Sequence, residues 1–372
     1  MSRVRKRVHP PFTQLIKQLP ATVPFVPPEA LERQTGQPIR LRLGANESDF
    51  GVSPLAQEAM RQALEEVSWY GDSENDALRT ALAHIHGVRK EEIVIGSGID
   101  DLLELAVRTF VEPGVPVVTS LGSYPTFQFH VTGFGGQLHF VPYRDWKNDL
   151  DALVEKARKV NARLLYLANP DNPTGTWHSA DDVARLIDAL PPGCMLILDE
   201  AYIEFAPPSA HLPIQGDHPQ VIRMRTFSKA YGMAGARIGY AIACEETISA
   251  FDKVRLHFGV NRIAQAGALA SLQDPDFVRD VVKEVNTGKK EYEAMADELG
   301  WRAIPSATNF VAIDVDDAER ARRIVDDLLK MGVFIRTPGV APLNRLIRIT
   351  VGKEEHRKQL SEALKIVADQ VR

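Results

Sequence analysis

The sequence predicts an α/β protein, in which a large domain built on a mostly parallel sheet is followed by a smaller α+β domain. Two observations support this prediction. Short apolar runs rich in β-branched residues alternate with amphipathic segments along the first two thirds of the chain, which is typical of a parallel sheet with helices on both faces. After Glu245 longer helical patterns are separated by a few short strands, which indicates a second unit.

Composition narrows the functional class. The chain has 372 residues, of which 44% are hydrophobic and 25% are charged, as expected for a globular enzyme with a large core. The net charge of −5 gives no general attraction to nucleic acid or to anionic membranes, and we expect neither as a partner. Residues 3–7 are basic but are followed by prolines, which indicates a frayed terminus rather than a secretory signal. No apolar run approaches the ~20 residues that span a bilayer.

The two cysteines, Cys194 and Cys244, each lie in or beside a predicted strand. They are interpreted as small buried side chains in a reducing compartment, and the expected location is cytoplasmic. Asp199-Glu200 after a strand is also how a metal site begins, but no second cluster of Asp or His supports one, so no metal site is expected.

The first 90 residues contain a proline-rich arm and two helices. Residues 10–40 hold seven scattered prolines, which exclude a regular helix and favour an arm across the surface or a cleft. A short strand is expected at 41–47. The helices are expected at 53–67, with Ser53 as the N-cap and Pro54 in the first turn, and at 72–87, beginning with Asp72.

A strand, a Gly-Ser-Gly turn and an amphipathic helix follow from residue 93. A helix start made of small residues offers free backbone N–H groups and the positive end of the helix dipole, and both favour a bound phosphate. Gly98, Ile99 and Asp100 lie at this start. The alternative is a simple turn in which Asp100 only caps the helix.

The next elements alternate regularly. Strands are expected at 115–120, 138–141, 163–168, 195–198, 221–224 and 238–243, and helices at 126–132, 150–160 and 180–190. Ligands of such sheets bind at the carboxyl ends of the strands. The later elements are helices at 275–299, 318–331 and from 354, with strands at 309–314, 333–336 and 346–350. We expect an arm at 1–40 packing near the small domain, a large domain at 41–255 and a small domain at 256–372.

Lys229 is the candidate reactive residue. It follows the strand at 221–224 in a loop of small and hydroxyl residues, with Arg237 further along the loop. Apolar surroundings and a second cation lower the pKa of a lysine, which can then form a Schiff base with a carbonyl. Thr226, Ser228 and Arg237 are suited to a phosphate monoester. An aldehyde and a phosphate on one small molecule indicate pyridoxal 5'-phosphate; the alternative is a surface lysine in a glycine-rich loop.

Two further strand ends carry polar side chains. Asn172 lies in the proline-bracketed turn after the strand 163–168, and Asp199 ends the strand 195–198. A carboxylate at the end of an apolar strand is costly unless it is paired, and the pyridinium nitrogen of the cofactor is a suitable partner. Tyr202, which follows closely, is placed to donate to the phenolic oxygen of the ring.

These stretches together resemble the fold-type I, class I/II pyridoxal-phosphate aminotransferases, and most of all the histidinol-phosphate aminotransferase branch. The resemblance runs from about residue 40 to the end and implies a seven-stranded large-domain sheet. Its motifs are Gly44-Ala-Asn-Glu47, Trp69-Tyr-Gly-Asp72, Gly96-Ser-Gly-Ile-Asp100, Tyr124-Pro-Thr-Phe127, Asn169-Pro-Asp-Asn-Pro-Thr-Gly175, Asp199-Glu-Ala-Tyr202, Thr226-Phe-Ser-Lys229 through Arg237, and Ile347-Arg-Ile-Thr-Val-Gly352.

The resemblance implies roles for cofactor-binding residues. Lys229 would hold the cofactor aldehyde and then move a proton, Asp199 would pair with the ring nitrogen, and Asn172 and Tyr202 would contact the ring oxygen. Phe127 would stack on the ring. Tyr70 would reach the phosphate in the neighbouring subunit, which implies a homodimer with shared active sites. The phosphate would lie among Gly98, Ile99, Asp100, Thr226, Ser228 and Arg237.

The resemblance also implies substrate contacts and leaves the reaction open. Arg348 and Arg336 would bind the acidic end of the substrate, Asn46 would lie near it, and Phe25 stands where the branch has a tyrosine. The expected reaction moves an amino group from histidinol phosphate, or from an aromatic or other L-amino acid, to a 2-oxo acid such as 2-oxoglutarate. The alternatives are a decarboxylase of the threonine-phosphate type and a cofactor-binding regulator without activity.

Overall fold

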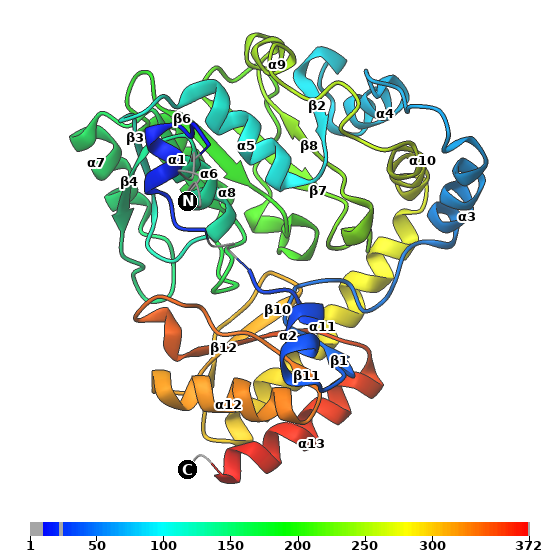
Figure 1. Ribbon diagram of the computed structural model, residues 1–372, viewed down its shortest axis with the longest axis vertical. Helices are drawn as coiled ribbons and strands as arrows, with labels where there is room; N and C mark the ends of the chain where they lie inside the picture. Colours follow the sequence, from blue (N-terminus) through cyan, green and yellow to red (C-terminus); the bar gives the residue numbers. More distant parts are fainter. Residues whose placement is uncertain (1–9, 22–24, 371–372) are drawn as a thin grey trace, which may run out of the picture.

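The structure is a computed structural model that describes residues 10–21 and 25–370, so the basic residues 3–7 lie outside the described part. Figure 1 shows a larger unit, built around a central sheet, above a smaller one. The central sheet has seven strands. In spatial order these are β2 (Ile93–Gly96), β8 (Gly239–Ile242), β7 (Val221–Thr226), β6 (Met195–Asp199), β5 (Leu164–Ala168), β3 (Pro116–Ser120) and β4 (Gln137–Val141).

The sheet is parallel except for β8, which runs antiparallel to both of its neighbours. The connection from β7 to β8 spans residues 227–238 and contains only a short 3-10 turn at Ala234–Ala236. Because it holds no helix to carry the chain back over the sheet, β8 returns directly beside β7. Thr226 therefore pairs in register with Gly239, and the whole connection stays at the carboxyl edge of the parallel strands. The expected mostly parallel sheet is confirmed.

Helices cover both faces of the sheet (Figure 1). Consecutive strand residues point to opposite faces, so Leu164 packs with one helical layer and Leu165 with the other. The first layer consists of α5 (Ile99–Phe110), α6 (Pro125–Gly133) and α9 (Glu245–Asp252). The second consists of α7 (Leu150–Val160), α8 (Ala180–Asp188), α4 (Asp76–His86) and α10 (Arg262–Ser271), with α3 (Pro54–Ala63) against α10.

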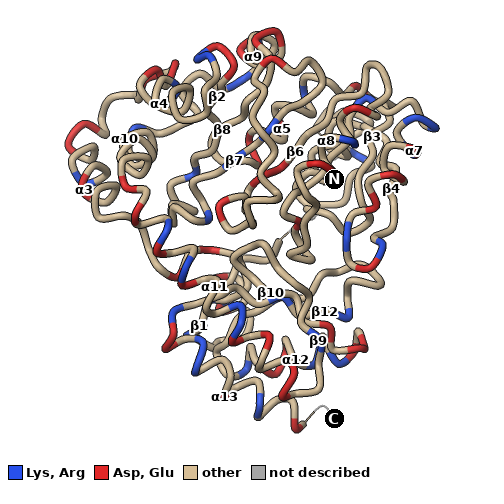
Figure 2. The backbone as a smooth tube through the Cα atoms, turned by 180° about the vertical axis from the view of Figure 1, so that it is seen from behind, with Lys and Arg blue, Asp and Glu red and all other residues tan. Residues whose placement is uncertain are grey.

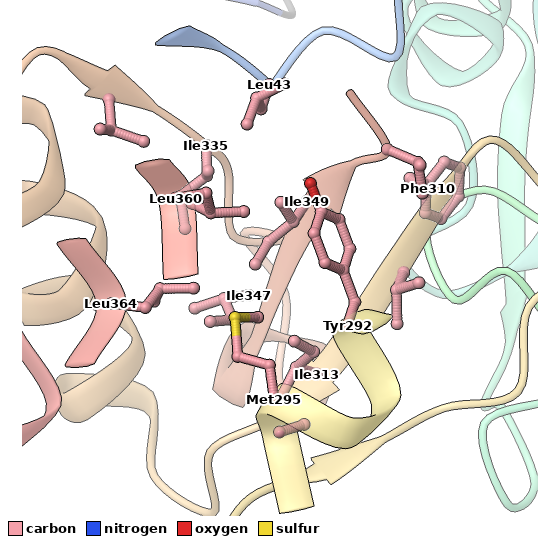
Figure 3. Close-up of a cluster of buried hydrophobic side chains, with 14 of the residues drawn as sticks. Leu43, Tyr292, Met295, Phe310, Ile313, Ile335, Ile347, Ile349, Leu360 and Leu364 are labelled. Carbon is pink, nitrogen blue, oxygen red and sulfur yellow. The ribbon is translucent and has the colours of Figure 1, made fainter. Parts of the chain in front are cut away.

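The smaller unit has a three-stranded antiparallel sheet in the order β12 (Leu346–Thr350), β10 (Phe310–Asp314), β9 (Arg302–Ala303). Three helices pack around it: α11 (Pro275–Glu298), α12 (Ala318–Lys330) and α13 (Glu354–Gln370). Figure 3 shows Tyr292 and Met295 of α11 and Leu360 and Leu364 of α13 pointing toward Ile347 and Ile349 of β12. A separate pair is formed by β1 (Leu41–Arg42), which lies parallel to β11 (Val333–Phe334).

The packing favours a later division between the units than the expected one near residue 255. Val260, Ala264 and Ala268 are buried against α4 and the β2–β8 edge of the large sheet. The side chains of α11, in contrast, belong to the core of the smaller unit. Leu41 and Leu43 also join that smaller core. We therefore place the division at the start of α11, with the β1 segment in the smaller unit.

The N-terminal arm contacts both units. In Figure 1 the short helix α1 (Gln14–Gln18) lies beside the large unit, where Leu15 approaches Gly135, and α2 (Pro28–Thr35) lies beside β1 in the smaller unit. Glu29 of α2 forms an ion pair with Arg42. The arm therefore passes from one unit to the other. The expectation that residues 10–40 contain no regular helix is wrong, because Pro28 lies in the first turn of α2, where a proline is tolerated.

The first expected helix start is confirmed, since Ser53 occupies the N-cap position of α3 and Pro54 is its first residue. The hydroxyl of Ser53 makes no capping hydrogen bond, because it donates to the carboxylate of Asp274 at the start of α11. The second helix begins at Asp76, and the carboxylate of Asp72 accepts the backbone N–H of Asp76 from outside the helix. The expected start at Asp72 is therefore wrong by four residues, whereas the partner of Ser53 lies 221 positions away, where the local sequence does not show it.

Acidic and basic residues are interspersed along the outer helices, including α12 and α13 (Figure 2). Within residues 10–21 and 25–370, no helix has both the length and the apolar composition needed to cross a membrane.

Candidate active site

A cavity of about 490 Å³ opens at the carboxyl edge of the large sheet, against β12 and the arm. This volume suits a small organic ligand. The cavity collects residues from strand ends far apart in sequence, as the parallel topology requires. The expected residues that line it are Phe25, Asn46, Ile99, Asp100, Asn172, Asp199, Tyr202, Thr226, Ser228, Lys229, Arg237, Arg336 and Arg348.

Lys229 lies three residues beyond the end of β7, and its amine faces this cavity. The amine donates a hydrogen bond to the backbone carbonyl of Asn46 at 3.0 Å and lies 5.5 Å from the ring centroid of Tyr202. Burial lowers the pKa of Lys229 to about 8, and the positive charge of Arg348 acts in the same direction. A substantial fraction of the amine is therefore neutral near pH 8, as a nucleophile or a proton acceptor requires.

Asp199 ends β6 and is buried, with 5% of its surface exposed. Its Oδ2 accepts the hydroxyl proton of Tyr166 at 2.7 Å, and its Oδ1 accepts the backbone N–H of Ala201 at 3.0 Å. Burial raises the pKa of Asp199 to about 6. Among the described residues no lysine, arginine or histidine forms an ion pair with Asp199, so a cationic ring nitrogen in the cavity would supply the missing counter-charge.

The N-terminus of α5 and the β7–β8 connection form one end of the cavity. Gly98 has φ +86°, and a Cβ at this position would lie 2.5 Å from the guanidinium of Arg237. Only glycine therefore lets Arg237 lie over the helix start. The N–H of Ser228 donates to the hydroxyl of Thr226, which fixes both residues beside Arg237. Backbone N–H groups, hydroxyls and a guanidinium at a helix N-terminus form a suitable site for a phosphate.

Arg348 and Arg336 lie at another end of the cavity. Arg348 donates to the amide oxygen of Asn172 at 2.6 Å and to the carbonyl of Gly44 at 3.1 Å. Arg336 donates to the carbonyl of Val26 at 2.9 Å. Its guanidinium lies 5.2 Å from the ring centroids of both Phe25 and Phe334.

Both guanidinium groups keep unused hydrogen-bonding capacity. The Nε of Arg336 and the Nε of Arg348 are buried, and neither has a hydrogen-bond acceptor in the described protein. Burial lowers the pKa of Arg348 to about 10, and the charge of Arg336 contributes to this shift. One buried and one half-buried cation that form no ion pair with a carboxylate among the described residues indicate a binding site for an anion.

The cavity fits pyridoxal 5'-phosphate in three respects. A carboxylate without a cationic partner is available for the ring nitrogen, a buried amine with a lowered pKa is available for the aldehyde, and the Gly98–Arg237 cradle is available for the phosphate. The oxygen of Asn172 is bonded to Arg348, so its amide nitrogen is the group left to donate to a ligand.

Three expected cofactor residues are not among those that line this cavity: Gly98, which lies against the guanidinium of Arg237, Phe127 and Tyr70. Phe127 is fully buried and stacks on Tyr166, with ring centroids 4.5 Å apart and an interplanar angle of 16°. Its place near the start of α6 turns it into the core beside the sheet, away from the cavity. Tyr124, immediately before that helix, lines the cavity instead and donates to Asp100 at 2.8 Å. Tyr70 is 77% exposed, 4.6 Å from the ring of Phe258, and does not line the cavity of its own chain.

Sequence reasoning missed Tyr166, which holds the carboxylate of Asp199. Tyr166 pairs in register with Ile197 on the neighbouring strand, two residues before Asp199. A tyrosine within an otherwise apolar strand next to β6 was the available signal, because its hydroxyl needs a buried partner.

Comparisons with known proteins identify the family. The profile of the family "Aminotransferase class I and II" matches residues 38–364. The chain belongs to this family. The aminotransferase is 49% identical to a histidinol-phosphate aminotransferase from Sinorhizobium meliloti whose crystal structure contains pyridoxal-5'-phosphate; the match has a TM-score of 0.95 and covers 98% of this chain and 100% of that one.

Two further relatives are also histidinol-phosphate aminotransferases. The aminotransferase is 36% identical to histidinol-phosphate aminotransferase 2 of Nitrosospira multiformis, over 93% of this chain and 89% of the relative. It is also 36% identical to histidinol-phosphate aminotransferase 1 of Nitrosococcus oceani, over 94% of each chain. The prediction of an enzyme of the pyridoxal-phosphate-dependent aminotransferase family is confirmed, as is its fold.

Proposed function

We propose that this aminotransferase takes the amino group of histidinol phosphate and passes it to a 2-oxo acid such as 2-oxoglutarate. The observation that carries the proposal is the pair Arg336, half-buried, and Arg348, buried, which line the cavity without a carboxylate partner among the described residues. A phosphate monoester carries up to two negative charges and several acceptor oxygens, which matches two guanidinium groups with free N–H groups. The matched relatives carry the same activity in their names.

The residues that line the cavity are assigned to the separate groups of the cofactor. Pyridoxal phosphate, when bound, supplies an aldehyde that condenses with amines and a protonated ring that accepts electrons. We assign Asp199 to the ring nitrogen, Asn172 and Tyr202 to the ring oxygen, and Arg237, Ser228, Thr226 and the N-terminus of α5 to the phosphate. Ionised Asp199 keeps a nearby ring nitrogen protonated, because the burial that opposes its charge is relieved by a cation.

Lys229 moves the proton in this proposal. Its lowered pKa, about 8, lets the amine take a proton from the Cα atom of the donor near neutral pH and return it to a neighbouring carbon. The amine already has a fixed acceptor in the carbonyl of Asn46, which keeps it within the cavity when it is not covalently engaged.

Arg336 and Arg348 serve both halves of the reaction. In the first half they hold the phosphate of the donor, and in the second half they hold a carboxylate of the 2-oxo acid. Phe25 lacks a hydroxyl and packs on the face of Arg336, so it orients the guanidinium without using one of its N–H groups.

We also propose that the enzyme is a homodimer in which Tyr70 completes the site of the partner. Trp69, Tyr70, Leu256 and Phe258 are all more than half exposed, and the rings of Tyr70 and Phe258 are in contact. Several exposed large apolar side chains close together favour a protein interface. Cys194 and Cys244 are both free, which supports the proposal of a reducing, cytoplasmic location.

A half-reaction experiment tests the substrate. The pyridoxal-phosphate-loaded enzyme is mixed separately with histidinol phosphate, histidinol, phenylalanine and tyrosine, and the conversion of the bound cofactor to its amine form is followed by absorbance. We expect histidinol phosphate to react at least 100-fold faster than histidinol, since only the phosphate engages both arginines.

Arg336→Met serves as the informative variant in this experiment, and Arg302→Met, at an exposed position of β9, serves as its control. The first substitution should bring the rate with histidinol phosphate close to the rate with histidinol, and the second should leave both unchanged. Equal rates for the two donors in the unmodified enzyme would overturn the proposed substrate. Release of carbon dioxide from threonine phosphate would instead establish a decarboxylase.

A further inference from the structure

We propose that Asn46 is a positioning residue, which sets the Lys229 amine and the Tyr202 hydroxyl relative to each other through its own backbone and side chain. The inference rests on the roles proposed above for Lys229 and Tyr202, and it replaces the expectation that Asn46 contacts the substrate. Asn46 lines the cavity but is 98% buried, and its hydrogen-bonding groups are engaged by the protein.

The side chain of Asn46 forms a hydrogen bond with Tyr202. Its Nδ2 donates to the hydroxyl oxygen of Tyr202 at 2.9 Å. An oxygen that accepts this bond still has its own proton to donate, and that proton must point away from the amide. Tyr202 lines the cavity, so the remaining direction is toward a ligand. Asn46 therefore makes the hydroxyl of Tyr202 a donor to a ligand oxygen.

Thr350 determines which end of the amide faces Tyr202. Its hydroxyl accepts the backbone N–H of Asn46 at 3.1 Å and donates to Oδ1 of Asn46 at 3.3 Å. A reversed amide would instead accept the Tyr202 hydroxyl proton at Oδ1 and donate to the Thr350 hydroxyl, so that neither hydroxyl would keep its present role. In the observed orientation Oδ1 accepts the Thr350 proton and the Tyr202 proton stays free for a ligand.

The backbone carbonyl of Asn46 forms a hydrogen bond with Lys229. It accepts the Lys229 amine at 3.0 Å and the side-chain amide of Asn309 at 3.2 Å, so both of its lone pairs are used. Asn309 precedes β10 and Thr350 ends β12, so Asn46 is held by the small unit while it contacts two residues of the large one. The position of the Lys229 amine therefore depends on the position of the small unit, through the contacts of Asn46.

The backbone conformation explains why this residue is asparagine. Asn46 has φ +55°, a region that residues other than glycine, asparagine and aspartate rarely occupy. Glycine keeps this conformation and the carbonyl but loses the amide. Aspartate keeps the shape but replaces the donor to Tyr202 by an acceptor.

Asn46→Gly and Thr350→Val separate these contributions. The first removes the amide and the second removes the hydroxyl that orients it, and both leave the carbonyl that binds Lys229. The readout is the visible absorbance of the pyridoxal-phosphate-loaded enzyme as a function of pH, without any donor. We expect its titration midpoint to shift by at least half a pH unit in Asn46→Gly and less, in the same direction, in Thr350→Val.

A double-mutant cycle with Tyr202→Phe locates the effect. Once the hydroxyl is absent, Asn46→Gly should cause no further shift, because the amide acts through that oxygen. In cofactor-free protein, the pH midpoint for acylation of Lys229 should stay near 8 in Asn46→Gly, since the carbonyl is retained.

The outcomes are distinct from those of the donor experiment, because no amino donor is present. Wild-type absorbance midpoints in Asn46→Gly and Thr350→Val would overturn the proposal, as would equal shifts in the presence and absence of the Tyr202 hydroxyl. If Asn46→Gly does not fold, Thr350→Val and its combination with Tyr202→Phe provide the same test. A shift that depends on Tyr202 supports the proposal whichever donor the enzyme uses.

Discussion

Two pairs of arginines in this enzyme, each with one buried and one half-buried member, differ in whether the protein supplies a counter-charge. Arg223 and Arg225 on β7 share the carboxylate of Glu200, with side-chain exposures of 3%, 13% and 2%. Arg336 and Arg348 line the cavity and share no carboxylate among the described residues. The first pair is electrostatically complete within the fold, whereas the second pair is complete only with an anionic ligand.

The two carboxylates at the end of β6 differ in the same way. Asp199 faces the cavity with only neutral donors, and burial raises its pKa to about 6. Glu200, the next residue, is also buried, but the charges of Arg225 and Arg223 outweigh burial and lower its pKa. Neighbouring residues of an extended chain point to opposite sides, so one carboxylate serves a ligand and the other serves the structure. In both comparisons the group without a counter-charge faces the cavity, and the group with one stabilises the fold.

The largest expected effect is the loss of turnover when a cavity residue is replaced. Lys229→Ala should lower turnover by roughly 10³- to 10⁴-fold or more, since it removes both the nucleophile and the proton carrier. Lys289→Met is the matched control, because burial also lowers the pKa of Lys289 to about 8 although it lies in α11 outside the cavity. Steady-state kinetics with the preferred donor measure both. Wild-type turnover in Lys229→Ala would show that its assigned role is wrong.

On the structural side, Glu200→Gln should lower the free energy of unfolding by about 3–5 kcal/mol, because it leaves two buried guanidinium groups without a counter-charge. Urea unfolding of the cofactor-free protein measures this loss. Glu245→Gln, which affects an exposed pair with Arg89, should change little. Equal stability of the two variants would contradict the distinction between the arginine pairs.

A matched pair of arginine substitutions sharpens the comparison further. Arg348→Met should lower kcat/KM for the donor by roughly 100- to 1,000-fold, through the loss of charge-assisted hydrogen bonds, and leave the free energy of unfolding nearly unchanged. Arg223→Met should lower the free energy of unfolding and leave kcat/KM nearly unchanged, since it removes the two hydrogen bonds that Arg223 donates to the buried carboxylate of Glu200. Both quantities are measured for both variants. A loss of stability in Arg348→Met as large as in Arg223→Met would show that Arg348 is primarily structural.

The smallest effect is a change in pH dependence. The pKa of Asp199 in the folded protein, about 6, exceeds its ordinary value of 3.8, so the folded state binds an extra proton between these values and stability falls as pH rises through them. The loss is about 3 kcal/mol, from about two pKa units at 1.36 kcal/mol each. Asp199→Asn should remove this slope in cofactor-free protein, as measured by urea unfolding between pH 4 and about 7.

Asp314→Asn provides the control of opposite sign. Burial tends to raise the pKa of Asp314, but its hydrogen bonds with Arg345 outweigh burial and the pKa is lowered. The wild-type carboxylate therefore contributes stability at neutral pH that is lost as pH falls through its folded pKa. Asp314→Asn should lose stability at neutral pH and approach the wild type in acid. The same slope in both variants would contradict these assignments.

Much of the site follows from sequence because the carboxyl ends of parallel strands share one edge. Asn172, Asp199 and Lys229 each follow a recognisable apolar strand, so their meeting in one cavity required no knowledge of packing. The order of elements and the division into a parallel and an antiparallel unit were predictable in the same way.

Tertiary packing decided the rest. Helix phase placed Tyr124 rather than Phe127 at the cavity, and the pairing of β5 with β6 brought Tyr166 to Asp199. Contacts of Asn46 with Thr350 and Tyr202 join residues 304 and 156 positions apart, and no local pattern encodes them. Sequence periodicity determines which element a residue belongs to, whereas the partner of a buried polar group is chosen by what lies within about 3 Å of it after folding.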